Sequence, residues 1–312
     1  MKHYRHMQAL SAKEAASATE KGTAVVIAGG TDLLGTLKDE ILPTYPETVV
    51  DLKTVEGLDG ISEDGDALRI GALVKLADAA ENDLVRQHCT ALADACARAA
   101  SPTIRHMGTL GGNACQMHRC WYFRVPDDRF HCRRKGGDYC PARIGDNRYH
   151  SIYGDQDGCY AASSHDSAPA LVALGATVVT TKREVAAADF FQANGARSNV
   201  LEDGEVVTEF KVPKAAKSAF RKFALRKSID FPIVNCAAVQ AASGEVRVVL
   251  GGVYPAPVRV EAAEAEVAGG VSESTAAKAG DAAVADCKPL GKNGYKVEIA
   301  RTMVKRTLLE LA

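Results

Sequence analysis

The chain has 312 residues, of which 46% are hydrophobic and 25% charged, and its formal net charge is −1. This composition is typical of a globular protein with a substantial core, and the near-zero charge gives no reason to expect nucleic acid or an anionic membrane as a partner. No apolar run approaches the roughly 18 residues of a membrane span, and no apolar signal-peptide core follows the polar N-terminus. We therefore expect a cytoplasmic protein, or one exported only with a partner.

The first chemically informative stretch follows a short apolar run. Residues 25–28 predict a buried strand, which breaks at Gly29-Gly30 before a helix-like segment begins at Thr31. Glycines between a strand and a helix allow backbone N–H groups to approach a phosphate closely, and the helix dipole favours the anion. The same pattern suits a tight turn in which Thr31 or Asp32 caps the helix, so both interpretations stay open.

Apolar periodicity and turn residues predict the remaining elements in chain order. Up to residue 212, strands are expected at 49–52, 67–72, 176–180 and 206–212, and helices at 83–100 and 168–174. In the last hundred residues, strands are expected at 219–225, 233–241 and 245–253, and helices at 260–267, 275–285 and 297–311. Strands followed by helices predict an α+β C-terminal domain that begins near Pro213 to Lys217.

Nine cysteines are distributed unevenly along the chain. Without a secretion signal, we explain them better as reduced thiols, metal ligands or residues that act with a cofactor than as a disulfide framework. Four of them fall in apolar helix-like or strand-like runs and are interpreted as structural, namely Cys89, Cys96, Cys236 and Cys287. The other five lie between residues 115 and 159.

Cys120, Cys132, Cys140 and Cys159 lie in a stretch with no sustained hydrophobic period. They lack the paired Cys-x-x-Cys spacing of zinc ribbons and ferredoxins, so spacing alone fits a metal site or scattered thiols equally well. A loop of this length without a core needs another constraint to be ordered. Metal ligation by thiolates supplies such a constraint, which favours the metal site.

The same stretch is locally basic, with eight Lys or Arg against four Asp between residues 119 and 148. Cations stabilise an anionic thiolate-bound cluster. A solvated basic loop, or a docking surface for an acidic electron carrier, would have the same composition. The aromatic residues 121–123 would shield a cluster, stack on a flavin or form a hydrophobic plug.

The histidines of this region form no His-x-x-x-His pair, and we assign them to packing or solvent. They are His106, His118, His131, His150 and His165.

Four motifs occur in an order that resembles a known family. They are AGGTDL at 28–33, TLGGN at 109–113, HDSAP at 165–169 and LGGV at 250–253. On these motifs, and over nearly its whole length, the chain is similar to the FAD-binding medium subunits of the molybdenum hydroxylases, the family of xanthine dehydrogenase and carbon monoxide dehydrogenase. The resemblance implies a two-lobed, vanillyl-alcohol-oxidase-like FAD-binding domain over residues 1–214. It also implies a small α+β C-terminal domain of antiparallel sheet and helices, like that of carbon monoxide dehydrogenase flavoproteins, over residues 215–312.

The resemblance also implies which residues contact the flavin. It implies that residues 28–34 contact the FAD pyrophosphate and that residues 109–113 make further phosphate and ribityl contacts. It also implies a ribose or ribityl contact at Asp166. Lys222 matches a basic residue near the flavin. The cofactor-binding residues expected are Ala28, Gly29, Gly30, Thr31, Asp32, Leu33, Leu34, Thr109, Gly111, Gly112, Asn113, Asp166 and Lys222.

Most members of the family lack residues 115–162, which we call the cysteine segment. It looks like the extra 4Fe-4S loop of the 4-hydroxybenzoyl-CoA reductase β subunit and of some bacterial aldehyde oxidoreductase flavin subunits. The resemblance therefore implies a 4Fe-4S cluster on Cys120, Cys132, Cys140 and Cys159. The interval of 19 between Cys140 and Cys159 is closer to the aldehyde-oxidising type. Cys115 is left out because the other four complete a cluster.

The implied function is that of an electron-transfer subunit with no catalytic side chain of its own. A large subunit with the molybdenum cofactor would carry the substrate reaction, and a small subunit with two 2Fe-2S clusters would exchange electrons with the FAD. The 4Fe-4S cluster would serve ferredoxin or a similar external carrier. Two alternatives stay open: a self-sufficient flavin oxidoreductase of the vanillyl-alcohol oxidase type, and a docking subunit stabilised by zinc.

Overall fold

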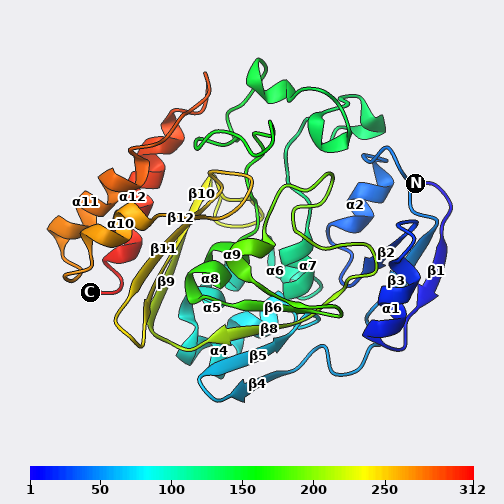
Figure 1. Ribbon diagram of the computed structural model, residues 1–312, viewed down its shortest axis with the longest axis horizontal. Helices are drawn as coiled ribbons and strands as arrows, with labels where there is room; N and C mark the ends of the chain where they lie inside the picture. Colours follow the sequence, from blue (N-terminus) through cyan, green and yellow to red (C-terminus); the bar gives the residue numbers. More distant parts are fainter.

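The computed structural model describes residues 1–312, which form three sheets with helices packed between and around them (Figure 1). The predicted α+β class is confirmed. None of the helices combines the length and the apolar character that a membrane crossing requires.

The first sheet is parallel and forms an N-terminal lobe at the right of Figure 1. Its strands β1 (Arg5–Gln8), β2 (Ala24–Ile27) and β3 (Thr48–Asp51) lie in the order β1-β3-β2 and are connected by α1 (Ala12–Thr19) and α2 (Leu33–Lys38). All four residues of the central strand β3 are buried. The lobe has a small hydrophobic core, which Leu73 and Val206 of the second lobe complete.

The second lobe is built on a five-stranded antiparallel sheet in the order β4-β5-β8-β6-β7. Its strands are β4 (Ile61–Asp64), β5 (Ala67–Gly71), β6 (Thr177–Thr180), β7 (Glu184–Ala186) and β8 (Val207–Pro213). Its helices are α3 (Leu76–Glu81), α4 (Asp83–His88), α5 (Thr90–Ala97), α6 (Pro102–Arg105), α7 (Leu110–Cys115), α8 (Ser167–Leu174) and α9 (Ala187–Phe190).

Two predictions for this lobe need correction. The helix expected over 83–100 is two helices, because the backbone of Cys89, at φ −140° and ψ 49°, leaves the helical region between α4 and α5. The pair Gly111-Gly112, expected in a turn, lies inside α7. Thr109 caps this helix, since its Oγ1 accepts a hydrogen bond of 3.0 Å from the Gly112 N–H.

The C-terminal domain has the expected antiparallel sheet, in the order β12-β11-β10-β9, with β12 as a strand that was not predicted. Its elements are β9 (Ala215–Phe223), β10 (Val234–Ala241), β11 (Val246–Gly251), β12 (Val258–Arg259), α10 (Glu261–Glu266), α11 (Glu273–Val284) and α12 (Tyr295–Leu308).

Strand β10 is buried on both faces, which explains its nearly continuous apolar sequence. Ala237 and Val239 join the core of the second lobe, whereas Cys236 and Ala238 face the core beneath α10 to α12. The C-terminal domain is therefore fixed against the second lobe by a shared core. The division between residues 214 and 215 stays a prediction.

The cysteine segment crosses the top of the molecule in Figure 1 and contains no strand. Beyond the end of α7, its regular structure consists of three short 3-10 turns, η1 (Pro126–Asp128), η2 (Arg133–Lys135) and η3 (Pro141–Arg143). Its order therefore depends on side-chain contacts and on backbone hydrogen bonds to the rest of the chain, such as that from the Ile152 amide to the Val253 carbonyl.

Helix α8 provides a test of the shared core, because all eight of its residues are buried. Replacing Leu171, which is 0% exposed, by Ala should lower the free energy of unfolding by about 2–5 kcal/mol, measured by urea unfolding followed by circular dichroism. Leu10 is 78% exposed, and Leu10→Ala should change it by less than about 0.5 kcal/mol. Equal effects of the two variants would contradict this packing.

Candidate functional site

A cavity of about 260 Å³ lies between the N-terminal lobe and the second lobe, and we call it the lobe cavity. It brings together the two glycine motifs, residues 28–34 and 109–113, which come from different lobes. Predicted site residues that line it are Ala28, Gly29, Gly30, Thr31, Asp32, Leu33, Thr109, Gly111 and Gly112. Four others, Leu34, Asn113, Asp166 and Lys222, lie outside its lining.

The two lobes meet backbone to backbone at Gly29, and Gly111 makes a similarly close backbone approach within the second lobe. A Cβ atom on Gly29 would lie 1.9 Å from the carbonyl oxygen of Met107, two residues before the second motif. A Cβ atom on Gly111 would lie 2.8 Å from the carbonyl oxygen of Ala72. Because real Cβ contacts are never this short, both positions require glycine to close the wall of the lobe cavity.

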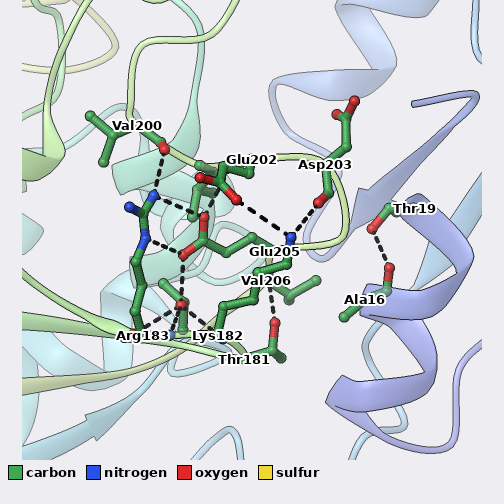
Figure 2. Close-up of polar contacts among 12 residues, drawn as sticks. Ala16, Thr19, Thr181, Lys182, Arg183, Val200, Glu202, Asp203, Glu205 and Val206 are labelled. Carbon is green, nitrogen blue, oxygen red and sulfur yellow. Dashed lines mark hydrogen bonds and ion pairs between the residues drawn. The ribbon is translucent and has the colours of Figure 1, made fainter. Parts of the chain in front are cut away.

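Residues 199–207 form another wall of the lobe cavity, and a buried carboxylate holds them in place (Figure 2). Glu205 accepts hydrogen bonds from Thr180 Oγ1 at 2.8 Å, Arg183 Nε at 2.9 Å and the Glu202 amide at 2.9 Å. Burial alone would raise the pKa of Glu205, but these donors outweigh burial and lower it. The glutamate therefore stays charged and the wall stays fixed.

Asp32 connects the first glycine motif to the cysteine segment. Its Oδ1 accepts from Arg119 Nη2 at 2.9 Å and from Arg124 Nη2 at 2.7 Å, and its Oδ2 accepts from the Met117 amide at 2.9 Å. Asp32 occupies the N-cap position of α2, as one interpretation predicted, but its side chain makes no cap hydrogen bond to the helix. Since α2 has only six residues, its dipole contributes less at the cavity than we expected.

Asp166 and Lys222 form a buried ion pair, with a carboxylate-to-ammonium distance of 2.8 Å. Burial raises the pKa of Asp166 to about 6, although the contacts with Lys222 and Asn235 act in the opposite direction. The next residue, Ser167, donates a hydrogen bond of 2.6 Å from Oγ to Asn113 Oδ1. The pair is thus connected to the second glycine motif through neighbouring residues.

The four predicted cluster ligands surround one small cavity of about 10 Å³, the cysteine cavity. Burial raises the pKa of Cys120 to about 12 and also raises the pKa values of Cys132 and Cys159. These thiols therefore stay protonated at neutral pH unless a metal replaces the proton. No three His, Cys, Asp or Glu side chains of the chain are placed to hold one metal ion.

A buried cation lines the same cavity. Arg134 is 7% exposed and forms no ion pair; its guanidinium donates to the carbonyls of Gly195, Ala196 and Arg197, and its Nη1 lies 3.0 Å from His118 Nδ1. Burying an uncompensated charge is costly. The cysteine cavity therefore favours an anionic occupant.

Three of the loop histidines are buried with specific partners, which the sequence did not indicate. His118 Nε2 lies 2.6 Å from the Pro255 carbonyl oxygen, and His150 Nε2 lies 3.2 Å from Cys120 Sγ. Burial lowers the pKa values of His150 and His165 to about 4 and that of His118 well below its usual range. All three are therefore neutral at physiological pH.

A third cavity, of about 470 Å³, lies between the cysteine segment and the loop from β9 to β10, and we call it the side cavity. Cys120 lines both this cavity and the cysteine cavity. Arg119, the partner of Asp32, also lines it, with its guanidinium 4.6 Å from the ring centroid of Phe231. Trp121 faces the side cavity, whereas Tyr122 and Phe123 line the cysteine cavity.

The buried ion pair predicts a pH-dependent variant. Lys222→Met leaves Asp166 buried and unpaired, which should cost about 3–5 kcal/mol of unfolding free energy near pH 8. The folded-state pKa of Asp166 lies above its unfolded value, so this cost is absent below the unfolded pKa of 3.8 and grows as the pH rises through the folded pKa. Urea unfolding should therefore show a smaller deficit near pH 5 than near pH 8. A deficit that does not change with pH would contradict the pairing, and Lys227→Met, on an exposed lysine, is the control.

Comparisons with known proteins agree with this architecture. Residues 2–215 match the family described as the FAD binding domain in molybdopterin dehydrogenase, and residues 218–311 match the carbon monoxide dehydrogenase flavoprotein C-terminal domain. The aldehyde oxidoreductase FAD-binding subunit PaoB of Escherichia coli is 34% identical over 311 residues, covering 96% of this chain and 95% of that protein.

Carbon monoxide dehydrogenase gives both a sequence and a structural match. Its medium chain from Hydrogenophaga pseudoflava is 28% identical and covers 91% of this chain and 88% of its own length. A solved structure of carbon monoxide dehydrogenase from the same organism superimposes with a TM-score of 0.76 at 26% identity, covering 99% of this chain and 97% of the other. The chain belongs to the FAD-binding subunit family of the molybdopterin dehydrogenases, which includes carbon monoxide and xanthine dehydrogenases.

Proposed function

We propose that this chain relays electrons between FAD and a 4Fe-4S cluster within a multi-subunit molybdenum hydroxylase-type oxidoreductase. The observation that carries the proposal is the arrangement of the four thiols. They surround a cavity with an unpaired buried arginine, and one of them, Cys120, also borders the side cavity. Two cofactors, one in each of these cavities, would be separated from each other by little more than one side chain.

The lobe cavity would hold the dinucleotide part of FAD. Glycines of both motifs line this cavity, so their backbone N–H groups could bind the pyrophosphate. We assign the flavin ring to the side cavity, next to Arg119, and a ribityl contact to Asp166 and Lys222. The bound FAD supplies the redox chemistry, and these residues position it and exclude water.

The cysteine cavity fits a thiolate-ligated cluster in its donor set and in its charge. A 4Fe-4S cluster bound by four thiolates is anionic, and Arg134 would provide the countercharge. Each thiolate binds a different iron atom, so the four sulfurs need not meet at one point, whereas zinc requires four ligands around a single centre. Because the cavity is about 10 Å³, the cysteine segment has to widen around a cluster. Its three short turns leave the backbone free to do so.

The relatives support the presence of other subunits, because they are themselves single subunits of larger oxidoreductases. A large subunit with the molybdenum cofactor would carry the substrate reaction, and a small subunit with two 2Fe-2S clusters would exchange electrons with the FAD. The 4Fe-4S cluster would serve ferredoxin or a similar external carrier. The 34% identity to the aldehyde oxidoreductase subunit favours an aldehyde as the substrate of the complex.

Affinity purification of the tagged chain from its native host should recover a molybdenum-containing partner. Substrate turnover by the isolated chain would instead support the self-sufficient flavoenzyme.

A pair of glycine substitutions tests the assignment of FAD to the lobe cavity. Gly29→Ala places a Cβ atom 1.9 Å from the Met107 carbonyl oxygen and should displace the first glycine motif, so the purified protein should lose most of its FAD. Gly35 lies inside α2, where an added Cβ atom would meet nothing within 4 Å, and Gly35→Ala should keep the parental FAD content. The absorbance of released flavin per chain measures both. Full FAD content in Gly29→Ala would place the cofactor elsewhere.

The cysteine ligands are tested separately from the flavin. Cys132→Ser or Cys140→Ser, purified anaerobically, should contain little iron or acid-labile sulfide and should keep FAD, because neither cysteine lines the lobe cavity. Cys287→Ser should retain both cofactors, since Cys287 lies in the C-terminal domain and away from all three cavities. Parent protein with about one zinc and no iron would refute the cluster. Simultaneous loss of FAD and iron in Cys132→Ser would show that FAD binding depends on the intact cluster.

A further inference from the structure

His150 lies at the boundary between the cysteine cavity and the side cavity. It is 2% exposed and lines the side cavity, and its Nε2 lies 3.2 Å from Cys120 Sγ. Its Nδ1 is buried and has no hydrogen-bond partner. The contact with sulfur is therefore the only polar contact that its imidazole makes.

The direction of this hydrogen bond follows from its acceptor. A thiolate that ligates iron has no proton to donate, so Nε2 carries the proton and donates it to Sγ. A hydrogen bond to a ligand sulfur withdraws electron density from it and stabilises the more anionic, reduced form of a cluster. Cys159 Sγ accepts a hydrogen bond of 3.5 Å from the Ala161 amide, and Cys120 is the one of the four whose sulfur contacts a histidine.

The C-terminal domain holds His150 in this position. Asn293 Nδ2 donates to the carbonyls of His150 at 3.2 Å and Ser151 at 2.8 Å. Lys296 Nζ donates to the His150 carbonyl at 2.9 Å, and both side chains come from residues that are at most 1% exposed. The Trp121 and Tyr122 rings each lie 5.8 Å from the imidazole between centroids. His150 is thus fixed by hydrogen bonds to its backbone carbonyl and by aromatic side chains packed against its ring.

We propose that His150 is a positioning residue that donates its Nε2–H to Cys120 Sγ and raises the reduction potential of the cluster. The inference rests on the proposed function, because it requires Cys120 to be a cluster ligand. The inference goes further because it assigns a role to His150: this histidine controls how readily the cluster accepts an electron from the flavin.

Reduction potentials of three variants of the full chain test this role. His150→Phe keeps an aromatic ring but removes the donor, so an EPR-monitored redox titration should give a cluster potential more negative than the parent's at unchanged iron content. His150→Gln places an amide nitrogen near the position of Nε2 and should restore part of the shift. His131→Phe, on a half-exposed ring that pairs with Asp128, should keep the parental potential. Parental potential in His150→Phe with full iron content would overturn the inference.

A second measurement uses the unmodified chain and does not depend on how His150→Phe folds. Protein labelled with ¹⁵N-histidine and reduced should show a weak ¹⁵N coupling to the cluster in pulsed EPR, and the coupling should vanish in labelled His150→Gln. A reduced cluster without any histidine ¹⁵N coupling would overturn the inference. A parent protein without iron and sulfide would overturn the proposed function itself, so the two failures are distinguishable.

Discussion

The ion pairs of Asp32 are the constraint on which the arrangement of the three cavities depends. This carboxylate belongs to the first glycine motif, yet both of its cationic partners, Arg119 and Arg124, belong to the cysteine segment. With the Met117 amide as a third donor, Asp32 anchors the start of the cysteine segment to the wall of the lobe cavity. Because charge-assisted hydrogen bonds are short and directional, Cys120 is held at a defined place relative to the lobe cavity.

The far end of the cysteine segment is anchored by the C-terminal domain. Lys292 and Asn293 contact residues 147–151, and the Lys288 amide donates to the Ile152 carbonyl at 2.7 Å. The domain is itself fixed by β10, whose two faces join two cores. A segment with only short turns is thus ordered between two rigid units. This explains how four cysteines distant in sequence surround one cavity without a disulfide.

The sequence predicted the parts of the fold and the site that have local signals. Alternating and periodic apolar residues predicted most strands and helices. The family resemblance assigned residues 28–34 and 109–113 to one cofactor, and most of these residues line the lobe cavity. The break at Cys89 was missed because neither glycine nor proline marks it. Single polar residues with distant partners were also missed, among them Glu205, Arg134 and His150. Their importance depends on burial and on contacts across the fold, which no local pattern encodes.

The central claim is that one chain holds FAD and an iron-sulfur cluster close enough to exchange electrons. Anaerobic reductive titration of the purified chain measures it most directly. With both cofactors bound, the chain should take up about three electrons, two on FAD and one on the cluster, and develop an iron-sulfur EPR signal as the flavin absorbance bleaches. Uptake of about two electrons without an iron-sulfur signal, from FAD-loaded protein, would contradict the claim.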